Sequence, residues 1–344
     1  MIDELDLALV DALRVDPRAP WSRLAGPLGV DPATLSRRWA RLEADGDAWV
    51  TCYPSADRIG RGLTALVEVE CGSGRVAEVA RALSGHPQIA SIEVVTGSAN
   101  LLLTVGAADP AALAGHLLEQ ICAVPGIGRT RTALVERTVR EGSRWSGGAL
   151  DAEQRRAIAE PPGEHRSPRA GRQIEEDLAL MQALGGDGRM PYAELAERTG
   201  LPATTVRRRL AELRDSGRLV LRCDASPRVT GNPLAVLLWL EVPPGRLEEA
   251  AGWLAGLPQA RMCAVTVGRA NLALYLMVRR LPELRRLEEE LARRFDRLRV
   301  RDRLVTLRTV KLVGRLLTQD GRAHGYVPID PWPIDPWPAG PPAE

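Results

Sequence analysis

Hydrophobic residues near the start of the chain recur at helical spacing. Apolar positions three or four residues apart predict one helix over residues 5–13 and a second, shorter helix over residues 21–28. Asp31 stands where an N-cap residue belongs and Pro32 at the first helical position, so a third helix is expected after a tight turn. Three short helices with a glycine-bearing turn between the second and third indicate a helix-turn-helix.

The same pattern returns in the second half of the chain. The motif DLALVDAL begins at Asp6 and DLALMQAL begins at Asp177, and we call the spacing between these two residues the repeat offset. Landmarks that match at the repeat offset are Leu24 and Leu195, Gly29 and Gly200, Gly60 and Gly231, Pro87 and Pro258, and Thr138 and Thr309. Helices are therefore expected again over residues 178–184, 192–199 and 203–213. Each half should fold into the same pair of modules, so the chain has the organisation of a fused dimer.

Strand-like runs follow each set of helices. TALVEVEC, from Thr64, and AVLLWLEV, from Ala235, predict buried strands. Each is followed by a helix, a pair of strands with a tight turn, a second helix and a last strand. The order βαββαβ predicts a ferredoxin-like domain, in which two helices cover one face of an antiparallel sheet. The uncovered face needs a partner, and the other copy is expected to pack against it face to face.

The whole chain is accordingly expected to be an α+β protein with two winged helix-turn-helix domains and two ferredoxin-like sensing domains in tandem. The expected boundaries are 1–53 for the first winged domain, 62–142 for the first sensing domain, 143–172 for a linker, 173–224 for the second winged domain, 233–315 for the second sensing domain and 316–344 for a proline-rich tail. The linker is rich in Gly, Pro and Arg, and the tail repeats PIDPW, which favours extended chain.

The outer face of each third helix carries the residues expected to contact double-stranded DNA. They are Thr34, Ser36, Arg37, Arg38 and Arg41 in the first copy, and Thr204, Thr205, Arg207, Arg208 and Arg209 in the second. Arginine and hydroxyl side chains on one helical face can bond both phosphates and base edges. The alternative is that these arginines only solvate a surface helix. The repetition of the basic face in both copies favours DNA contact.

The two expected wings, near residues 49–51 and 219–221, differ in charge. Glu43, Asp45 and Asp47 near the first wing would repel phosphate, whereas Arg218 and Arg222 near the second would attract it. We therefore expect the second copy to bind DNA more tightly than the first.

Composition narrows the class of protein without deciding it. The 344 residues, of which 45% are hydrophobic, can form several cores, and a net charge of +2 leaves any nucleic-acid surface to a local patch. The five cysteines form no CxxC pair, so neither a metal site nor a cofactor is predicted. The N-terminal stretch is acidic and amphipathic and no apolar run is long enough for a membrane span, so we expect a cytoplasmic protein with no membrane partner.

Together these motifs resemble the Lrp/AsnC family of leucine-responsive and asparagine-responsive regulators, in a tandem form. The resemblance rests on IDELDLALVDAL, on LAGPLGVDPATLSRRWARLEADGDAWV and LAERTGLPATTVRRRLAELRDSGRLVL, and on the hairpins VVTGSANLLLTV and VTVGRANLALYLMV. It covers nearly all of both copies, without the linker and the tail. It implies a sequence-specific transcriptional regulator that responds to a small-molecule effector, an amino acid or related metabolite. It also implies pairing of the two copies and assembly into a homo-oligomer.

The resemblance further implies an effector site at the hairpins. The family's TGxxD motif falls on Thr96, Gly97 and Asn100 in the first copy and on Gly268 and Asn271 in the second. Both copies carry asparagine where the family usually has aspartate, and an amide cannot pair ionically with an α-ammonium group. Glycine and asparagine also suit tight turns, so the alternative is that these residues only shape the hairpins.

Two other functions fit the same architecture. Sirohaem decarboxylases resemble it as fused pairs and rely on histidine and arginine near the hairpins. Here the four histidines, His86, His116, His165 and His324, are scattered and none lies in a hairpin. We therefore expect a protein that is not an enzyme. The third alternative is an interaction protein that has lost DNA binding, and the retained arginines argue against it.

Overall fold

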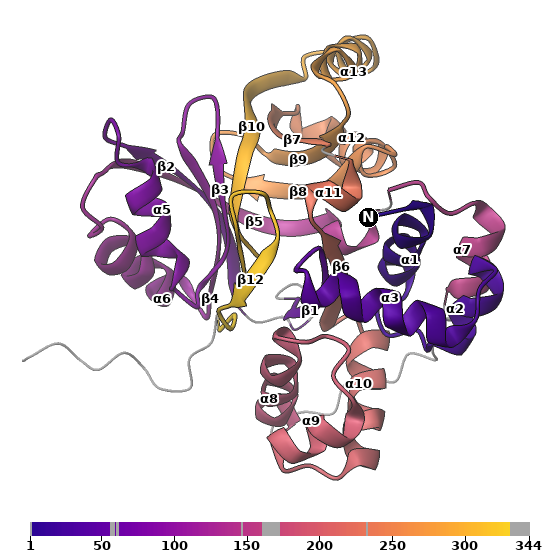
Figure 1. Cartoon of the computed structure of the whole chain (residues 1–344). Helices are drawn as coiled ribbons and strands as arrows, with labels where there is room; N and C mark the ends of the chain where they lie inside the picture. Colours follow the sequence, from indigo (N-terminus) through magenta and orange to yellow (C-terminus); the bar gives the residue numbers. More distant parts are fainter. Residues whose placement is uncertain are drawn as a thin grey trace, which may run out of the picture.

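The computed structural model describes residues 2–55, 59, 62–145, 147–159, 173–231 and 233–330. Two three-helix units lie beside a central group of strands (Figure 1). The first unit contains α1 (Glu4–Val15), α2 (Trp21–Leu28) and α3 (Pro32–Ala44), and the second contains α8 (Gln173–Gly185), α9 (Tyr192–Thr199) and α10 (Ala203–Asp215). The spacing of apolar residues predicted all six helices.

Local signals fix the helix ends of the first unit. Asp3 and Asp6 form a capping box at the start of α1, in which each side chain accepts the other's backbone N–H. Gly29 ends α2 with φ at +69°, a conformation that other residues rarely adopt. Asp31 caps α3 as expected, whereas Pro202, at the equivalent position before α10, offers no side-chain cap.

Strands β1 (Ala48–Pro54) and β6 (Leu219–Ala225) follow α3 and α10 and pair with each other in antiparallel fashion. The expectation of a separate wing in each copy was therefore wrong. Neither three-helix unit, which we also call a reader, contributes a second strand of its own to this sheet. The backbone groups of each strand are therefore satisfied by its counterpart from the other copy. The two three-helix units also share one hydrophobic core, which includes Leu9 and Leu35 of the first and Leu180 and Leu210 of the second.

Eight further strands form a closed ring. They are β2 (Leu63–Cys71), β3 (Ile89–Val95), β4 (Leu101–Ala107), β5 (Ile127–Arg140), β7 (Leu234–Glu241), β8 (Ala260–Val267), β9 (Leu272–Val278) and β10 (Arg299–Leu312). Within each copy the neighbours run β3-β4-β2-β5 and β8-β9-β7-β10, as a βαββαβ domain requires. The copies join where β5 pairs with β8 and β10 pairs with β3. Each last strand pairs with its own copy along its first half and with the other copy along its second half.

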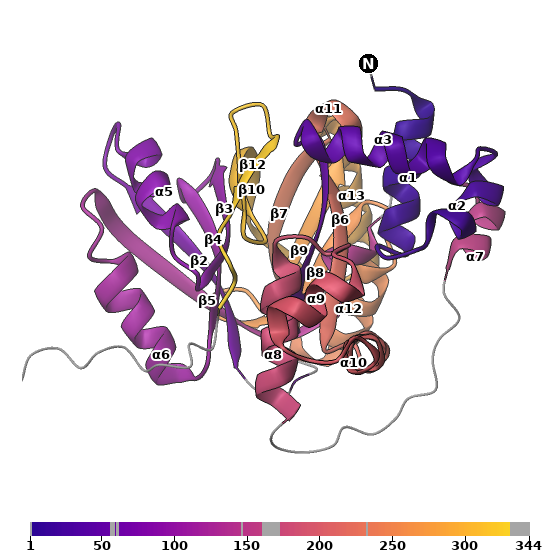
Figure 2. The same ribbon diagram turned by 60° about the horizontal axis from the view of Figure 1, so that its bottom comes forward.

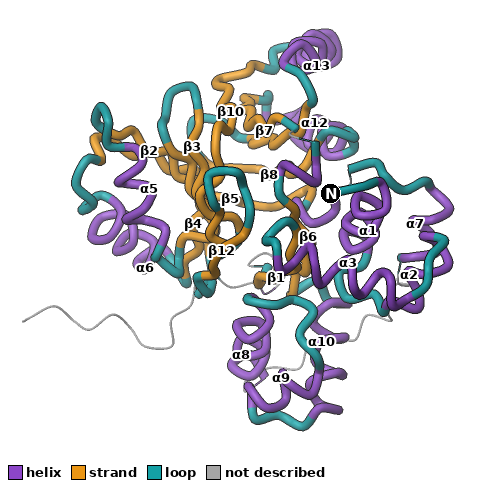
Figure 3. Tube along the Cα trace, viewed as in Figure 1, coloured by secondary structure: helices purple, strands orange, loops and turns teal. Residues whose placement is uncertain are grey.

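Helices lie on the outside of this ring of strands (Figures 2 and 3). The outer elements are α5 (Val76–Ser84), α6 (Pro110–Gly115) and the π-helix η1 (His116–Ile121) in the first copy, and η3 (Pro244–Arg246), α12 (Leu247–Ala255) and α13 (Leu281–Arg294) in the second. Inside the ring, Leu66, Leu102, Leu237 and Leu304 from the two copies form one apolar cluster. The sheets thus face each other as expected, and their edges also pair. In the described part of the chain, no helix combines the length and apolar character that a bilayer span needs.

The described part of the segment expected to be a linker contains helical structure. After β5 it forms η2 (Gly142–Arg144) and α7 (Ala152–Ile158), which lies against the first three-helix unit. The buried carboxylate of Asp11 accepts the backbone N–H groups of Gly147 and Ala149, at 2.9 and 2.7 Å. Glycine-rich chain is ordered here because a neighbouring element satisfies its backbone groups.

The segment expected to be a tail also begins with ordered structure. Strands β11 (Arg315–Leu317) and β12 (Ala323–Tyr326) form a hairpin beyond β10, and the backbone N–H of Ala323 donates to the carbonyl of Gly46 at 2.8 Å. The short helix α11 (Pro227–Thr230) links β6 to the second sensing domain. Most of the PIDPW repeat lies outside the described residues.

Candidate nucleic-acid interface, sensing hairpins and central cavity

The basic face of α3 carries three arginines in different environments. Arg37 is exposed and forms no ion pair with a described residue. Arg38 lies 2.8 Å from a carboxylate oxygen of Asp3 and 3.0 Å from one of Asp6, and its hydrogen bond to Asp3 raises the pKa of Arg38. Arg41 lies 2.6 Å from Asp6. Two of the three arginines therefore tie α3 to α1.

The hydroxyl residues of the two third helices are placed unequally. The backbone N–H and the hydroxyl of Thr34 both donate to Asp31, at 2.9 and 2.6 Å, and these bonds lower the pKa of Asp31. Ser36 and Thr205 are half-buried, and Thr204 is exposed. Thr34 thus completes the helix cap, whereas Thr204 is accessible to a ligand.

In α10 two arginines are exposed. The guanidinium of Arg207 lies 5.2 Å from the ring centroid of Tyr192, a cation–π contact. Arg208 lies 2.8 Å from Glu212, one turn further along the same helix. Exposed pairs of this kind are weak, so both guanidinium groups can exchange these partners for phosphate.

Arg209 does not face outward, and this prediction was wrong. Its side chain is 10% exposed, and its guanidinium lies 3.1 Å from Asp177 and also pairs with Glu176. The same ion pair occurs between Arg38 and Asp6, because both partners recur at the repeat offset. The pair joins the first and third helices of each unit. Because this ion pair recurs in both copies, we interpret it as structural. Helical spacing alone does not reveal such a pair.

Three of the five charged residues expected near the wings, Asp47, Arg218 and Arg222, also lie elsewhere. Arg218 bonds a carboxylate of α8 at 3.1 Å, and buried Arg222 places Nε and Nη2 each 2.6 Å from Asp224. Asp47 is buried too, and its carboxylate accepts from the hydroxyl of Ser226 at 2.7 Å. Because β1 pairs with β6, Asp47 and Arg222 point into the protein. They no longer support tighter DNA binding by the second copy.

Asn100 and Asn271 join neighbouring strands at the sensing hairpins. The side-chain oxygen of Asn271 accepts from the backbone N–H of Val242 at 2.8 Å, and its amide nitrogen donates to the carbonyl of Val242 at 2.7 Å. Asn100 accepts from the backbone N–H of Cys71, the equivalent position, at 2.7 Å. An aspartate could not make the donating bond of Asn271, which explains the amide at that position.

The hairpin glycines lie where the two copies meet. Gly97 has φ at +95°, and a Cβ there would lie 2.8 Å from Leu304 of the second copy. At Gly268 a Cβ would lie 3.1 Å from Ala133 of the first copy, which is the equivalent contact. Thr96 donates its backbone N–H to β10 at 2.9 Å. The predicted effector residues thus occupy the junctions between the copies.

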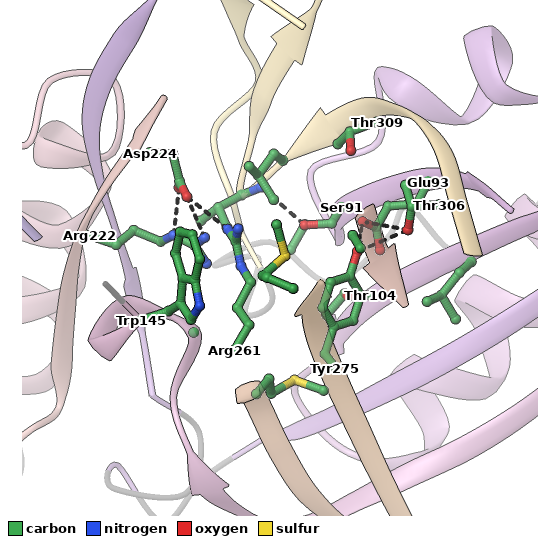
Figure 4. Close-up of a pocket in the computed structure, with 18 of the residues that line it drawn as sticks. Ser91, Glu93, Thr104, Trp145, Arg222, Asp224, Arg261, Tyr275, Thr306 and Thr309 are labelled. Atoms are coloured by element: carbon green, nitrogen blue, oxygen red, sulfur yellow. Dashed lines mark hydrogen bonds and ion pairs between the residues drawn. The ribbon is translucent and has the colours of Figure 1, made fainter. Parts of the chain in front are cut away.

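A cavity of about 790 Å³ lies between the paired strands β1 and β6 and the inner faces of the ring. Its apolar wall includes Leu66, Leu102, Leu237, Met262 and Met277. Figure 4 shows polar side chains in two groups, with sulfur-bearing side chains between them. The sequence did not reveal this site, because its residues are spread over both copies and become neighbours only when the ring closes.

One polar group borders the paired strands and contains Arg222, Asp224 and Arg261 (Figure 4). Arg261 on β8 donates from Nη2 to Asp224 on β6 at 2.8 Å. Burial alone would raise the pKa of Asp224, but Arg222 and Arg261 together hold it below its usual value. This ion cluster links the three-helix units to the ring.

The other polar group lies deeper in the ring and contains Glu93, Tyr275 and Thr306 (Figure 4). The hydroxyl of Tyr275 donates to Oε1 of Glu93 and lies 3.0 Å from the hydroxyl of Thr306. Burial raises the pKa of Glu93, and burial together with Glu93 raises that of Tyr275 well above its usual value. Tyr275 therefore remains a hydrogen-bond donor at neutral pH.

The histidines take no part in this cavity as far as the described residues show. His86 contacts Gln120, His116 lies in η1, and His324 lies in β12. His165 falls outside the described residues. Within the described ranges, no three His, Cys, Asp or Glu side chains gather as metal ligands would.

Comparisons with known proteins identify both kinds of domain. A family model described as the Lrp/AsnC ligand binding domain matches residues 64–145, and one described as an AsnC-type helix-turn-helix domain matches residues 2–43 and 175–214. An uncharacterized HTH-type transcriptional regulator of Pyrococcus abyssi is 30% identical over 131 residues, which are 37% of this chain and 82% of that protein. The HTH-type transcriptional regulator AldR of Mycolicibacterium smegmatis is 28% identical over 148 residues, 41% of this chain and 85% of that protein.

Two solved structures of one protein span both halves of the chain. The sirohaem decarboxylase NirDL superposes with a TM-score of 0.56 at 18% identity, over 90% of this chain and 93% of that one. At this identity the likeness is evidence for the fold alone.

Proposed function

The chain belongs to the Lrp/AsnC family, and from that premise we propose that it binds specific sequences of duplex DNA and responds to a small-molecule effector. The observation that carries the proposal is the basic face present on both third helices. Arg37, Arg207 and Arg208 are exposed there, and α3 and α10 correspond to the helices that enter the major groove in helix-turn-helix proteins.

The proposed DNA-contacting set keeps those residues expected from the sequence that are exposed or half-buried. It comprises Thr34, Ser36, Arg37, Arg38 and Arg41 in α3, and Thr204, Thr205, Arg207 and Arg208 in α10, without the buried Arg209. Arg38 and Arg41 would have to share their guanidinium groups between Asp6 and phosphate. Arg37, Arg207 and Arg208 would give up only weak contacts, so we assign the largest contributions to them.

The two readers present different side chains to DNA. Position 36 is serine in the first copy and its equivalent, position 207, is arginine; position 41 is arginine and its equivalent, position 212, is glutamate. A symmetric dimer reads a palindrome, whereas these two helices, fixed in one layer by the β1–β6 pair, suit an asymmetric operator. We propose that the domain boundaries expected from the sequence hold apart from this shared layer, and that chains assemble further into a homo-oligomer.

Salt-dependent binding to duplex DNA tests the proposal. Replacing Arg207 and Arg208 with glutamine should weaken binding more than Arg37→Gln, and each lost phosphate contact should reduce the slope of log affinity against log salt by about 0.9. Arg285→Gln is the matched control, because Arg285 pairs with Glu289 one turn along an exposed helix on the far side of the ring. Affinities and salt slopes equal to wild type in both the Arg207/Arg208 and the Arg37 variants would refute the assignment.

Chemistry on a tetrapyrrole is the second candidate. The observation that favours it is the likeness to the sirohaem decarboxylase NirDL, one of whose structures holds an iron-uroporphyrin III analogue, together with the cavity. The positions of His86, His116 and His324 outside the cavity weigh against it. Absorbance titration with iron-uroporphyrin III separates the candidates: tight binding of one molecule per chain supports the enzyme, and an unchanged spectrum removes it.

A further inference from the structure

The central cavity combines a guanidinium with unused donors and a carboxyl with an unused acceptor. Arg261 makes one hydrogen bond, from Nη2 to Asp224, and its Nε and Nη1 bond no described residue. Arg222 already neutralises Asp224 through two bonds of 2.6 Å. Glu141, another carboxylate at this end, accepts from the hydroxyl of Tyr53 at 2.7 Å. The donors of Arg261 are therefore available to an anionic group.

The opposite end of the cavity offers hydrogen-bonding groups, and the exposed Arg308 of β10 also lines the cavity. Glu93 uses Oε1 for Tyr275 and Thr306, and Oε2 bonds no described residue. Burial raises the pKa of Glu93 and so disfavours its charged form, whereas a guanidinium stays charged. Leucine and methionine side chains line the space between the two ends. A volume near 790 Å³ is typical of sites for drug-sized molecules.

The cavity is chemically asymmetric although the fold around it is nearly symmetric. At the repeat offset, the counterpart of Arg261 is Ala90, that of Glu93 is Ala264, that of Tyr275 is Thr104 and that of Met277 is Gly106. All eight residues line the cavity, and each large side chain has a smaller counterpart. A homodimer could not achieve this, because every polar group would occur twice. The fused chain therefore holds one cavity with distinct ends.

We propose that this cavity is the effector site and that it binds one organic anion per chain, with the acidic group on Arg261 and an apolar body directed toward Glu93. The effector role rests on the proposed DNA-binding function, whereas binding itself does not. This assignment moves the effector away from the hairpin glycines and asparagines, whose side chains and backbone already serve the junctions between copies.

The position of Arg261 explains how an anion bound in the cavity would affect the two three-helix units. Asp224 lies on β6, directly after the reading helix α10, and Arg261 lies on β8 of the ring, so their bond joins the two layers. An anion bound to Nε and Nη1 of Arg261 offsets the charge of the guanidinium and so weakens its attraction to Asp224. Trp145 also lines the cavity and stacks with Arg14 of α1, at 4.8 Å. An anion in the cavity therefore changes contacts of both three-helix units. Coupling between effector binding and DNA binding requires such a difference in contacts between the two states.

Fluorescence titration of the purified full chain with 8-anilinonaphthalene-1-sulfonate tests the site. This probe has an aromatic body and one sulfonate, and N-phenyl-1-naphthylamine is the same body without the acid. We expect one sulfonate probe per chain and a loss of about tenfold or more in its affinity on Arg261→Met, because charged hydrogen bonds are lost. The neutral probe should change by less than about threefold. Arg269→Met, which removes an exposed arginine outside the cavity lining, is the matched control and should bind like wild type.

A second variant tests the volume without removing a charge. Thr104→Tyr copies the side chain of its counterpart Tyr275 into the cavity and should weaken both probes. Equal affinities of wild type and Arg261→Met for the sulfonate probe would overturn the proposal, as would unchanged binding in Thr104→Tyr. If the probe binds as expected but the chain shows no salt-dependent DNA binding, the proposed function fails while the cavity assignment stands. If DNA binds but the probe ignores both cavity variants, only the cavity assignment fails.

Discussion

Lys311, the only lysine in the chain, is fully buried on β10 and donates one hydrogen bond from Nζ to the carbonyl of His86, at 2.8 Å. Burial lowers its pKa from an ordinary 10.5 to about 8. Its counterpart in the first copy, Arg140, donates to the carbonyls of Ala255 and Leu257 and so closes the other junction in the same way. We predict that Lys311→Met stabilises the protein at neutral pH.

The magnitude follows from the change in protonation on folding. The folded chain binds this proton less tightly than the unfolded chain, so the cost of the buried charge is fully present below pH 8. It disappears as the pH rises toward 10.5. This difference in the pKa of Lys311 between the unfolded and the folded chain lowers the free energy of unfolding by about 3 kcal/mol at pH 7, at about 1.36 kcal/mol per unit of pKa. Losing the bond to the His86 carbonyl costs about 1 kcal/mol, which leaves a net gain of about 2 kcal/mol for Lys311→Met.

Thermal unfolding of wild type and Lys311→Met between pH 7 and pH 10.5 measures this effect. The variant should have the higher Tm at pH 7, and the difference should shrink and then vanish or reverse as the pH approaches 10.5. Lys311→Arg serves as a control, because it keeps a charge at every pH in this range. A difference in Tm that does not depend on pH would show that the lysine carries no burial cost, and the reasoning would fail.

Three further predictions concern the junctions and the readers. Asn271→Ala removes two hydrogen bonds and should lower stability by about 1–3 kcal/mol in chemical unfolding, and Asn271→Asp, which keeps only the acceptor, should not restore it. Gly97→Ala places a side chain against Leu304 at positive φ and should lower the free energy of unfolding by about 1–3 kcal/mol. Gly85→Ala, with open space around it, should not. Equal Tm values of the two variants would contradict the close approach. Arg209→Met should destabilise the fold and leave the salt slope of DNA binding unchanged, so a slope reduced by about 0.9 would return this arginine to the DNA face.

Local patterns identified the elements of this chain. Apolar spacing predicted α1, α2, α3 and their counterparts, and the recurrence of motifs at the repeat offset predicted that both halves share one fold. The cap at Asp31 was predicted because a cap depends on residues within one turn. The family followed from the same motifs, and the comparisons confirm it.

The roles of single charged residues were harder to predict. Helical spacing puts Arg209 beside Arg208 on the outer face, yet Asp177, which is distant in sequence, draws Arg209 into the fold. Arg222 was expected at a wing and lies at the cavity, because β1 and β6 pair across the copies. The contacts of such residues depend on partners that are distant in the sequence.

The sequence by itself determined which elements form, their order and the near-identity of the two halves, because helix caps, apolar periods and turns depend on neighbours along the chain. Only the tertiary structure decided that the last strands cross between copies, that the ring closes, and that Arg261, Asp224, Tyr275 and Glu93 border one cavity. The physical reason is that strand pairing at a sheet edge and the burial of charge are settled by contacts between segments far apart in the chain.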